Sequence, residues 1–126
     1  MKFTIPVPVY STYVNIYIHN SDKKLIETNN LIMSKFGSKP ETEFKSKGRA
    51  YRVYINEEGF RCADIVFHKK SLSFGLIAHE VLHCVNYIME YVDIVLCDES
   101  EEAFTCLMGY LTQSIHKKLN SKLNIK

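Results

Sequence analysis

The stretch FGLIAHEVLHCVNYIM, residues 74–89, constrains the fold most, because it combines a helical apolar repeat with two regularly spaced histidines. Its apolar residues stand at positions 74, 77, 78, 81, 85 and 88, the spacing of the buried side of an α-helix. His79 and His83 are four residues apart, so they project from the same side of that helix. Asn86 and Glu90 continue this polar stripe. The pattern predicts a helix that is packed on one side and carries two neighbouring imidazoles on another.

The segment His79-Glu80-Val81-Leu82-His83 is an H-E-x-x-H pentad, an order of residues typical of a catalytic zinc site. On a helix, both imidazoles can reach one Zn²⁺ ion at a bond length of roughly 2.0–2.1 Å. Glu80 is placed to accept a proton from a metal-bound water. We therefore expect His79 and His83 to be zinc ligands and Glu80 to be the catalytic base.

A catalytic zinc site needs a third protein ligand, and the sequence offers four acids downstream of the pentad. They are Asp98, Glu99, Glu101 and Glu102. Glu102 fits best, because Cys106 and Gly109 follow on its side of the last predicted helix, and Gly109 lets that side approach closely. Glu99 and Glu101 are also explained as first-turn acids, which the helix dipole favours. We expect Glu102 to be the third ligand, and the other three acids stay as alternatives.

Composition narrows the classes to which the chain can belong. Its 126 residues are enough for one domain, residues 1–126, and its 46% apolar content is typical of a globular protein. A net charge of +2 argues against nucleic acid or an anionic membrane as the principal partner. No apolar stretch has the length of a signal-peptide core or a transmembrane helix, so we expect a cytoplasmic protein.

The four cysteines form no C-x-x-C pair, so a zinc knuckle is not indicated and reduced thiols are the simplest interpretation. Cys84 stands next to His83 in the sequence, but it points about 100° away around the helix. We therefore expect Cys84 to be a packing residue and not a ligand.

The N-terminal half predicts one strand, one helix and one loop. Val9–Ile18 is rich in β-branched and aromatic residues, which is typical of a strand. A helix follows, capped by Ser21 or Asp22 and running to about Lys35. Residues 37–48 are polar without periodicity and are predicted to be a loop.

The second half predicts a hairpin and two helices. Ala50–Ile55 and Arg61–His68 are expected to be its strands, and the pentad helix is expected to run from Ser71 or Ser73 to about Tyr91. The last helix is predicted from about Glu99 to Leu119, with Asp98 as its N-cap and Glu101 completing a capping box. Its apolar stripe is Phe104, Leu107, Met108, Leu111 and Ile115. The order β-α-β-β-α-α predicts an α+β domain with a small sheet beside the pentad helix.

These features resemble a known group of proteins. The pentad, followed 19 positions later by a glutamate on the next helix, resembles the gluzincin branch of the zincin metallopeptidases. The segment Glu101–Thr105 is similar to the helix that bears the third ligand in ImmA/IrrE-type peptidases. Glu102–Tyr110 also resembles a helix of small H-E-x-x-H proteins often encoded by bacteriophages. The resemblance covers roughly residues 60–118 and implies a minimal zincin-like domain, in which the sheet packs on the pentad helix and a C-terminal helix bears a ligand.

The resemblance implies a zinc-dependent metallopeptidase that hydrolyses a peptide or protein bond, in a host cytoplasm or associated with a virion. The strand Ala63–His68 is a candidate edge for pairing with an extended peptide. The candidates for stabilising the oxyanion, each also explained as a packing residue, are His68, Tyr87, Tyr91 and Tyr110. The competing hypothesis is a non-catalytic zinc-binding protein, of phage or bacterial origin, that keeps this fold and binds a partner protein.

Overall fold

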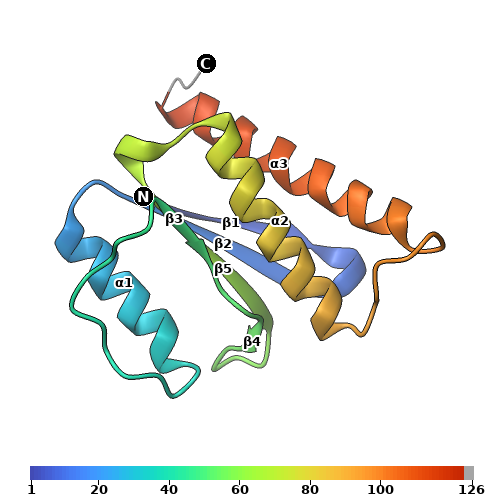
Figure 1. Cartoon of the computed structure of the whole chain (residues 1–126), viewed down its shortest axis with the longest axis horizontal. Coiled ribbons are helices and arrows are strands. Elements are labelled where there is room, and N and C mark those ends of the chain that lie inside the picture. The colour runs from blue at the N-terminus through green and yellow to red at the C-terminus, as the bar shows by residue number, and fades with distance from the viewer. Residues whose placement is uncertain (124–126) are drawn as a thin grey trace.

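The structure is a computed structural model that describes residues 1–123, with side chains described as far as Ser121. Figure 1 shows one β-sheet with three α-helices around it. In chain order the elements are β1 (Lys2–Val7), a 3-10 turn (Pro8–Tyr10), β2 (Thr12–His19), α1 (Asp22–Ser34), β3 (Gly48–Ala50), β4 (Tyr54–Ile55), β5 (Arg61–His68), a second 3-10 turn (Lys69–Ser71), α2 (Phe74–Tyr91) and α3 (Glu101–Leu123). This arrangement confirms the predicted α+β class.

The five strands form one sheet with β5 in its interior. The order is β1-β2-β5-β3, and β4 also pairs with β5. β1 and β2 are antiparallel, β2 and β5 are parallel, and β3 and β4 are antiparallel to β5. The parallel pair requires a long crossover connection, which contains α1. Because β5 has strand neighbours on both sides, the prediction of an open edge at Ala63–His68 is wrong. Within residues 1–123 the edges are β1 on one side and β3 on the other.

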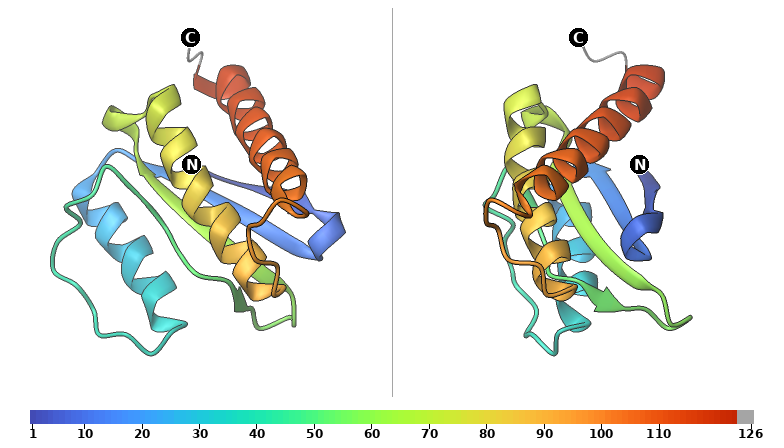
Figure 2. Two further views of the ribbon diagram at one scale, coloured as in Figure 1. Left: turned by 45° about the vertical axis from the view of Figure 1, so that its right-hand side comes forward. Right: turned by 90° about the vertical axis from the view of Figure 1, so that its right-hand side faces the viewer.

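Different helices cover the two faces of the sheet. Figure 2 shows α2 and α3 side by side, with α1 apart from them. The main core lies beneath α2 and α3 and includes Ile16 of β2 and Phe67 of β5. A smaller core lies beneath α1, where Leu25 and Ile32 pack with Val66. Successive side chains of a strand point to opposite faces, so Val66 and its neighbour Phe67 belong to different cores.

The strands differ from the prediction in two places. β1 was not predicted; its residues Phe3, Ile5 and Val7 alternate with exposed residues and bury one side in the main core. A 3-10 turn and Ser11, at a left-handed φ of 49°, separate β1 from β2, so the predicted strand Val9–Ile18 begins only at Thr12. Of the predicted strand Ala50–Ile55, Ala50 ends β3 and Tyr54 and Ile55 form β4, while residues 51–53 lie between the two strands. The order is therefore β-β-α-β-β-β-α-α.

The helices begin close to where the sequence predicts. Ser21 caps α1 by accepting a hydrogen bond from the Lys24 N–H at 3.1 Å. Ser73 caps α2 by accepting from the Leu76 N–H at 3.1 Å. α3 begins at Glu101, two residues after the predicted start at about Glu99, so the prediction of Asp98 as its N-cap is wrong. The predicted apolar stripe of α3 is confirmed, and Leu119 extends it.

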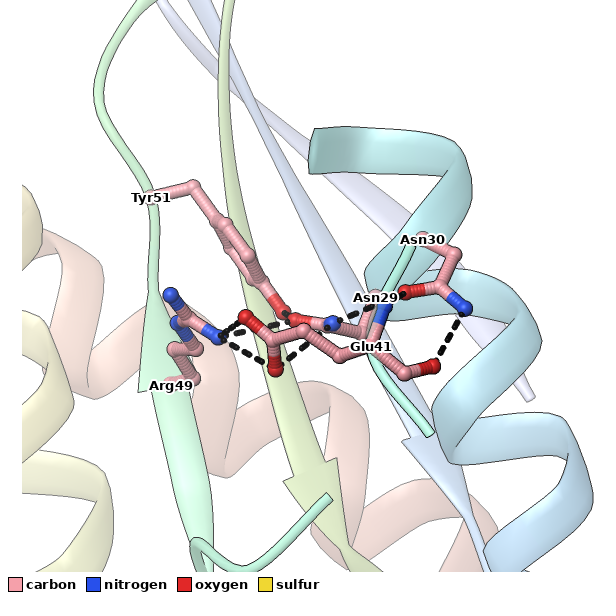
Figure 3. Close-up of polar contacts among 5 residues, drawn as sticks. All are labelled: Asn29, Asn30, Glu41, Arg49 and Tyr51. Carbon is pink, nitrogen blue, oxygen red and sulfur yellow. Dashed lines mark hydrogen bonds and ion pairs between the residues drawn. The ribbon is translucent and has the colours of Figure 1, made fainter. Parts of the chain in front are cut away.

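Residues 38–47, which we call the strap, are joined to α1 and β3 by one group of polar contacts (Figure 3). The Glu41 N–H donates to Asn30 Oδ1 at 2.8 Å, and Asn30 Nδ2 donates to the Glu41 carbonyl at 2.9 Å. The Glu41 carboxylate pairs with Arg49 at 3.3 Å. Arg49 and the Tyr51 hydroxyl both donate to Asn29 Oδ1, at 3.1 and 2.6 Å. The strap is therefore fixed at its middle, although it contains no helix or strand.

Candidate metal centre

α2 places the residues of the pentad in two environments. The side of α2 that faces the sheet is buried and carries Ile77, Val81, Cys84, Val85, Ile88 and Met89. His79 and His83 lie on the opposite side and are exposed. Glu80 lies between these two sides and is buried, with 5% of its surface exposed. The predicted packing role of Cys84 is confirmed, because it is fully buried in the main core.

The two histidines are direct neighbours on the helix surface. Their ring centroids are 5.0 Å apart, and the ring planes make an angle of 68°. About two thirds of the His79 side chain is exposed, so its ring nitrogens have access to solvent. The structure therefore places two imidazoles where a metal ion and its water ligands can approach from outside.

Glu80 points toward β3 and requires a glycine there. A Cβ atom at Gly48 would lie 3.1 Å from Glu80 Cγ and 3.1 Å from Phe67 Cδ1, which is tighter than ordinary packing. Gly48 thus makes room for the Glu80 side chain between α2 and the edge strand. Sequence reasoning missed this role, because Gly48 stands at the end of a polar loop with no local pattern around it.

The protonation of Glu80 reflects opposing influences. Burial raises the pKa of the Glu80 carboxyl above its ordinary value, because the charged form loses water. The two histidines and the backbone amide of Ala50 act in the opposite direction. Glu80 Oε1 lies 3.7 Å from His79 Nε2. A carboxylate with a raised pKa beside two imidazoles is a better proton acceptor near neutral pH than an exposed one.

The structure does not bring Glu102 to the histidines. Glu102 is exposed in the first turn of α3, where the Cys106 thiol donates to its Oε1 at 3.7 Å. Within the described residues, no three His, Cys, Asp or Glu side chains lie close enough together to hold a metal ion. The same holds for the alternatives Asp98, Glu99 and Glu101. The assignment of the third ligand stays a prediction.

The relative position of the two helices explains this separation. The ring centroids of Phe74, at the start of α2, and His116, near the end of α3, are 4.6 Å apart. Near the other end of the pair, Phe104 shares one surface hollow with Asn86 and Glu90. The helices therefore run antiparallel, and the first turn of α3 lies beside the C-terminal half of α2, beyond His83.

Of the four candidates for stabilising an oxyanion, only Tyr87 lies next to the pentad, with its ring stacked near that of His83 at 6.5 Å. His68 caps a 3-10 turn, where its Nδ1 accepts from the Lys70 N–H. The Tyr91 ring lies under the Arg61 guanidinium, and the Tyr110 hydroxyl donates to a carbonyl of β1. These three residues have structural contacts elsewhere.

Two surface hollows flank the edge strand β3. One, of about 550 Å³, has His79 and Glu80 on one wall and Gly48 with the end of the strap on the other. The second, of about 310 Å³, is lined by Tyr87, residues 49–52 and residues at the C-terminal end of α1. His79 and Glu80 therefore line the first hollow, and Tyr87 lines the second.

Comparison with protein families, with curated proteins and with solved structures found no match to this chain. The resemblance described above therefore depends on the quoted motifs alone. None of the helices within residues 1–123 combines the length and the apolar character needed to cross a membrane.

Proposed function

We propose that this protein is a metal-dependent hydrolase that cleaves peptide or protein bonds at the H-E-x-x-H helix. The observation that carries the proposal is the arrangement of three side chains on α2. Two exposed imidazoles lie 5.0 Å apart, centroid to centroid, and the buried carboxylate of Glu80 lies 3.7 Å from one of them at the wall of an open hollow. A helix packed only for stability has no need of this combination.

Two of the three proposed ligands are placed to bind zinc. His79 and His83 supply two imidazole ligands on one accessible surface, which suits Zn²⁺. Glu102 would complete a set of two histidines and one glutamate, but it lies outside the group formed by the two rings. When bound, zinc at this position supplies a water molecule of lowered pKa.

Glu80 would perform the proton transfers of the reaction. Its carboxylate would accept a proton from the attacking water and return it to the leaving amine. Burial assists this role by raising the pKa of the carboxyl. Tyr87, beside His83, is the residue we assign to the oxygen of the scissile carbonyl.

The edge strand β3 is the surface that we assign to the substrate backbone. Within the described sheet no strand lies beyond β3. The Lys47 carbonyl and the Tyr51 N–H bond to β5, so by strand alternation the backbone groups of Gly48 and Ala50 point away from β5. The Ala50 amide acts there on the Glu80 carboxylate, which leaves the Gly48 groups and the Ala50 carbonyl for a substrate. An extended peptide pairing there would pass directly in front of Glu80 and His79.

The test measures metal content and cleavage separately. Native protein should bind about one zinc per chain, and His79→Ala and His83→Ala should lose it. With a mixed peptide library and mass spectrometry, native protein should give chelator-sensitive cleavage. Glu80→Gln should keep its zinc and lose roughly 10²–10⁴ in rate, whereas Glu90→Gln, further along the exposed stripe, should match native protein. Cleavage that persists in Glu80→Gln or in the chelator would contradict the proposal.

A second candidate function is a non-catalytic zinc-binding protein that binds a partner. The separation of Glu102 from the histidines favours it, because a site with two protein ligands is weak for catalysis. Zinc binding with no cleavage of any peptide or host extract would select this function. Absence of zinc binding would exclude both.

A further inference from the structure

The second hollow at the edge strand, of about 310 Å³, has walls that belong to both faces of the sheet. Ala50 and Tyr87 pack against the main core, beneath α2 and α3. Tyr51 and Met33 pack in the smaller core, beneath α1. The hollow therefore reaches around the edge of the sheet from one face to the other. A peptide that extends the sheet beyond β3 would pass through it.

Consecutive residues of β3 connect this hollow with the pentad. Gly48 lines the hollow that contains residues of the pentad, and the next two residues, Arg49 and Ala50, line the second. Tyr87 also lines the second hollow, and its ring centroid lies 6.5 Å from that of His83. Paired strands advance together, residue by residue. A substrate residue in the second hollow would thus lie about two to four positions along the peptide from the one in front of the pentad.

Both charged residues among the described lining of this hollow are arginines. Arg52 is exposed and has no acidic partner among the described residues. Arg49 pairs with Glu41, which does not line the hollow, through Nη1 alone. Figure 3 shows the other terminal nitrogen of Arg49 pointing away from Glu41. Two guanidinium groups therefore have N–H donors to spare, and their preferred partner is a carboxylate.

The remaining walls of the hollow are mostly apolar. Phe36 and Met33 contribute side chains from the end of α1, and Tyr51 and Tyr87 contribute rings. The Arg49 guanidinium lies 5.3 Å from the centre of the Tyr51 ring, so it is held in place before a ligand arrives. Apolar walls displace water and strengthen an ion pair formed between them. The hollow suits a side chain with an apolar stem and an acidic end, which describes glutamate.

We propose that this hollow is the subsite that selects a glutamate side chain in the peptide substrate. Arg52 would bind the carboxylate, and Arg49 would assist it. The proposal rests on the proposed function, because the path of the peptide along β3 is taken from it. Glutamine at the same position would lose the ion pair, and lysine would be repelled. The substrate class is therefore a peptide or protein segment with a glutamate a few residues from the cleaved bond.

The first test measures selectivity without cleavage. The probes are the blocked peptide Thr-Val-Thr-Glu-Thr-Val and its counterparts with Gln or Lys in place of Glu. The alternating background lets each peptide shift along β3 until the variable residue meets the hollow. In calorimetric titration of full-chain Glu80→Gln, the Glu peptide should bind at least tenfold more tightly than the Gln peptide. In amide NMR spectra it should shift residues 49–52 and Tyr87.

Variants assign the selectivity to Arg52. In the same Glu80→Gln background, Arg52→Gln should reduce the preference for Glu over Gln to near unity. Arg52→Glu should reverse the preference, so that the Lys peptide binds best, which a merely structural role of Arg52 would not produce. Lys23→Gln removes the same charge from the exposed start of α1 and should keep the native preference.

The second test uses cleavage and separates this inference from the hydrolase proposal. Products of a mixed peptide library cut by native protein should carry glutamate at one position near the cleaved bond. Cleavage without that enrichment would overturn the subsite and leave the hydrolase. Preference for the Glu peptide with no cleavage would contradict the hydrolase and leave the glutamate-binding hollow. The subsite is also overturned if no probe binds at millimolar concentration, or if Arg52→Gln keeps the preference together with its melting temperature.

Discussion

Gly48 shows how strongly a single missing side chain can determine the position of a functional group. A Cβ atom there would be 3.1 Å from both Glu80 Cγ and a ring carbon of Phe67. Of these two neighbours, Phe67 is held in the main core. The carboxylate we assign as the base is therefore positioned from the strand as well as from its own helix.

Gly48→Ala should consequently destabilise the fold, by roughly 1–2 kcal/mol, through overpacking. Thermal unfolding should show a melting temperature lower by a few degrees. Gly109→Ala is the matched control, because nothing lies within 4 Å of a Cβ there and alanine favours a helix by roughly 0.5–1 kcal/mol. Equal effects from the two substitutions would contradict this account of Gly48.

We expect titration of Asp64 to make the stability of the folded protein depend on pH. Burial raises the pKa of its carboxyl in the folded protein, so the folded state holds this proton more tightly than the unfolded state. The stability of native protein should fall as pH rises from about 4 through the raised pKa. Asp64→Asn should lack this contribution. Melting temperatures of both proteins from pH 4 to 8 measure it, and parallel curves would show that the carboxyl is not perturbed.

At the scale of elements, local patterns predicted more than long-range ones. α2 was predicted closely, because its apolar repeat and its Ser73 cap are contained in a short stretch. β1 was missed, since its burial depends on pairing with β2 and on packing against α3. The division of Ala50–Ile55 into β3 and β4 likewise depends on which residues of β5 stand opposite.

The residues of the candidate site also differ in whether the sequence could predict their positions. The positions of His79 and His83 follow from helix geometry alone, so sequence reasoning found them. Whether Glu102 reaches them depends on how far α3 is displaced along α2, which no local pattern encodes. Gly48 and Arg52 owe their roles to neighbours distant in the sequence, so sequence reasoning did not find them.

Substitutions near the start of α3 can test which residue is the third zinc ligand. If Glu102 completes the zinc site, Glu102→Gln should weaken zinc at least tenfold, and Glu99→Gln and Glu101→Gln should have little effect. Calorimetric zinc titration of the three variants decides this. Unchanged affinity in all three would contradict Glu102 as the third ligand.

The buried side-chain amide of Asn29 helps to hold the strap in place. Tyr51→Phe removes the 2.6 Å hydrogen bond to Asn29 Oδ1 and leaves Asn29 buried. We expect a loss of about 1–2 kcal/mol in the free energy of unfolding. Backbone amides of residues 38–47 should also exchange hydrogen faster. Lys45→Ala, whose ion pair with Glu43 is exposed, is the control and should leave exchange unchanged. Unaltered exchange in Tyr51→Phe would show that the strap is fixed by Glu41 alone.

At the scale of the whole molecule, the four cysteines report on the integrity of the core. Cys62 and Cys84 are buried, and burial raises the pKa of the Cys84 thiol to about 12. Cys97 and Cys106 are exposed. A maleimide at neutral pH should therefore add rapidly to two thiols in native protein and to four in denaturant, as intact mass will show. Rapid modification of a third thiol would mean that one face of the sheet opens in solution.

The interior position of β5 has a consequence for how the chain acquires its structure. The contact between Asn15 and Asp64 spans 49 positions, so the parallel pair at the centre of the sheet closes late compared with the β1–β2 hairpin. During synthesis, the backbone groups of β2 that pair with β5 have no partner until β5 leaves the ribosome. Because α2 follows β5 almost immediately, the histidines emerge only as the sheet that supports them becomes complete.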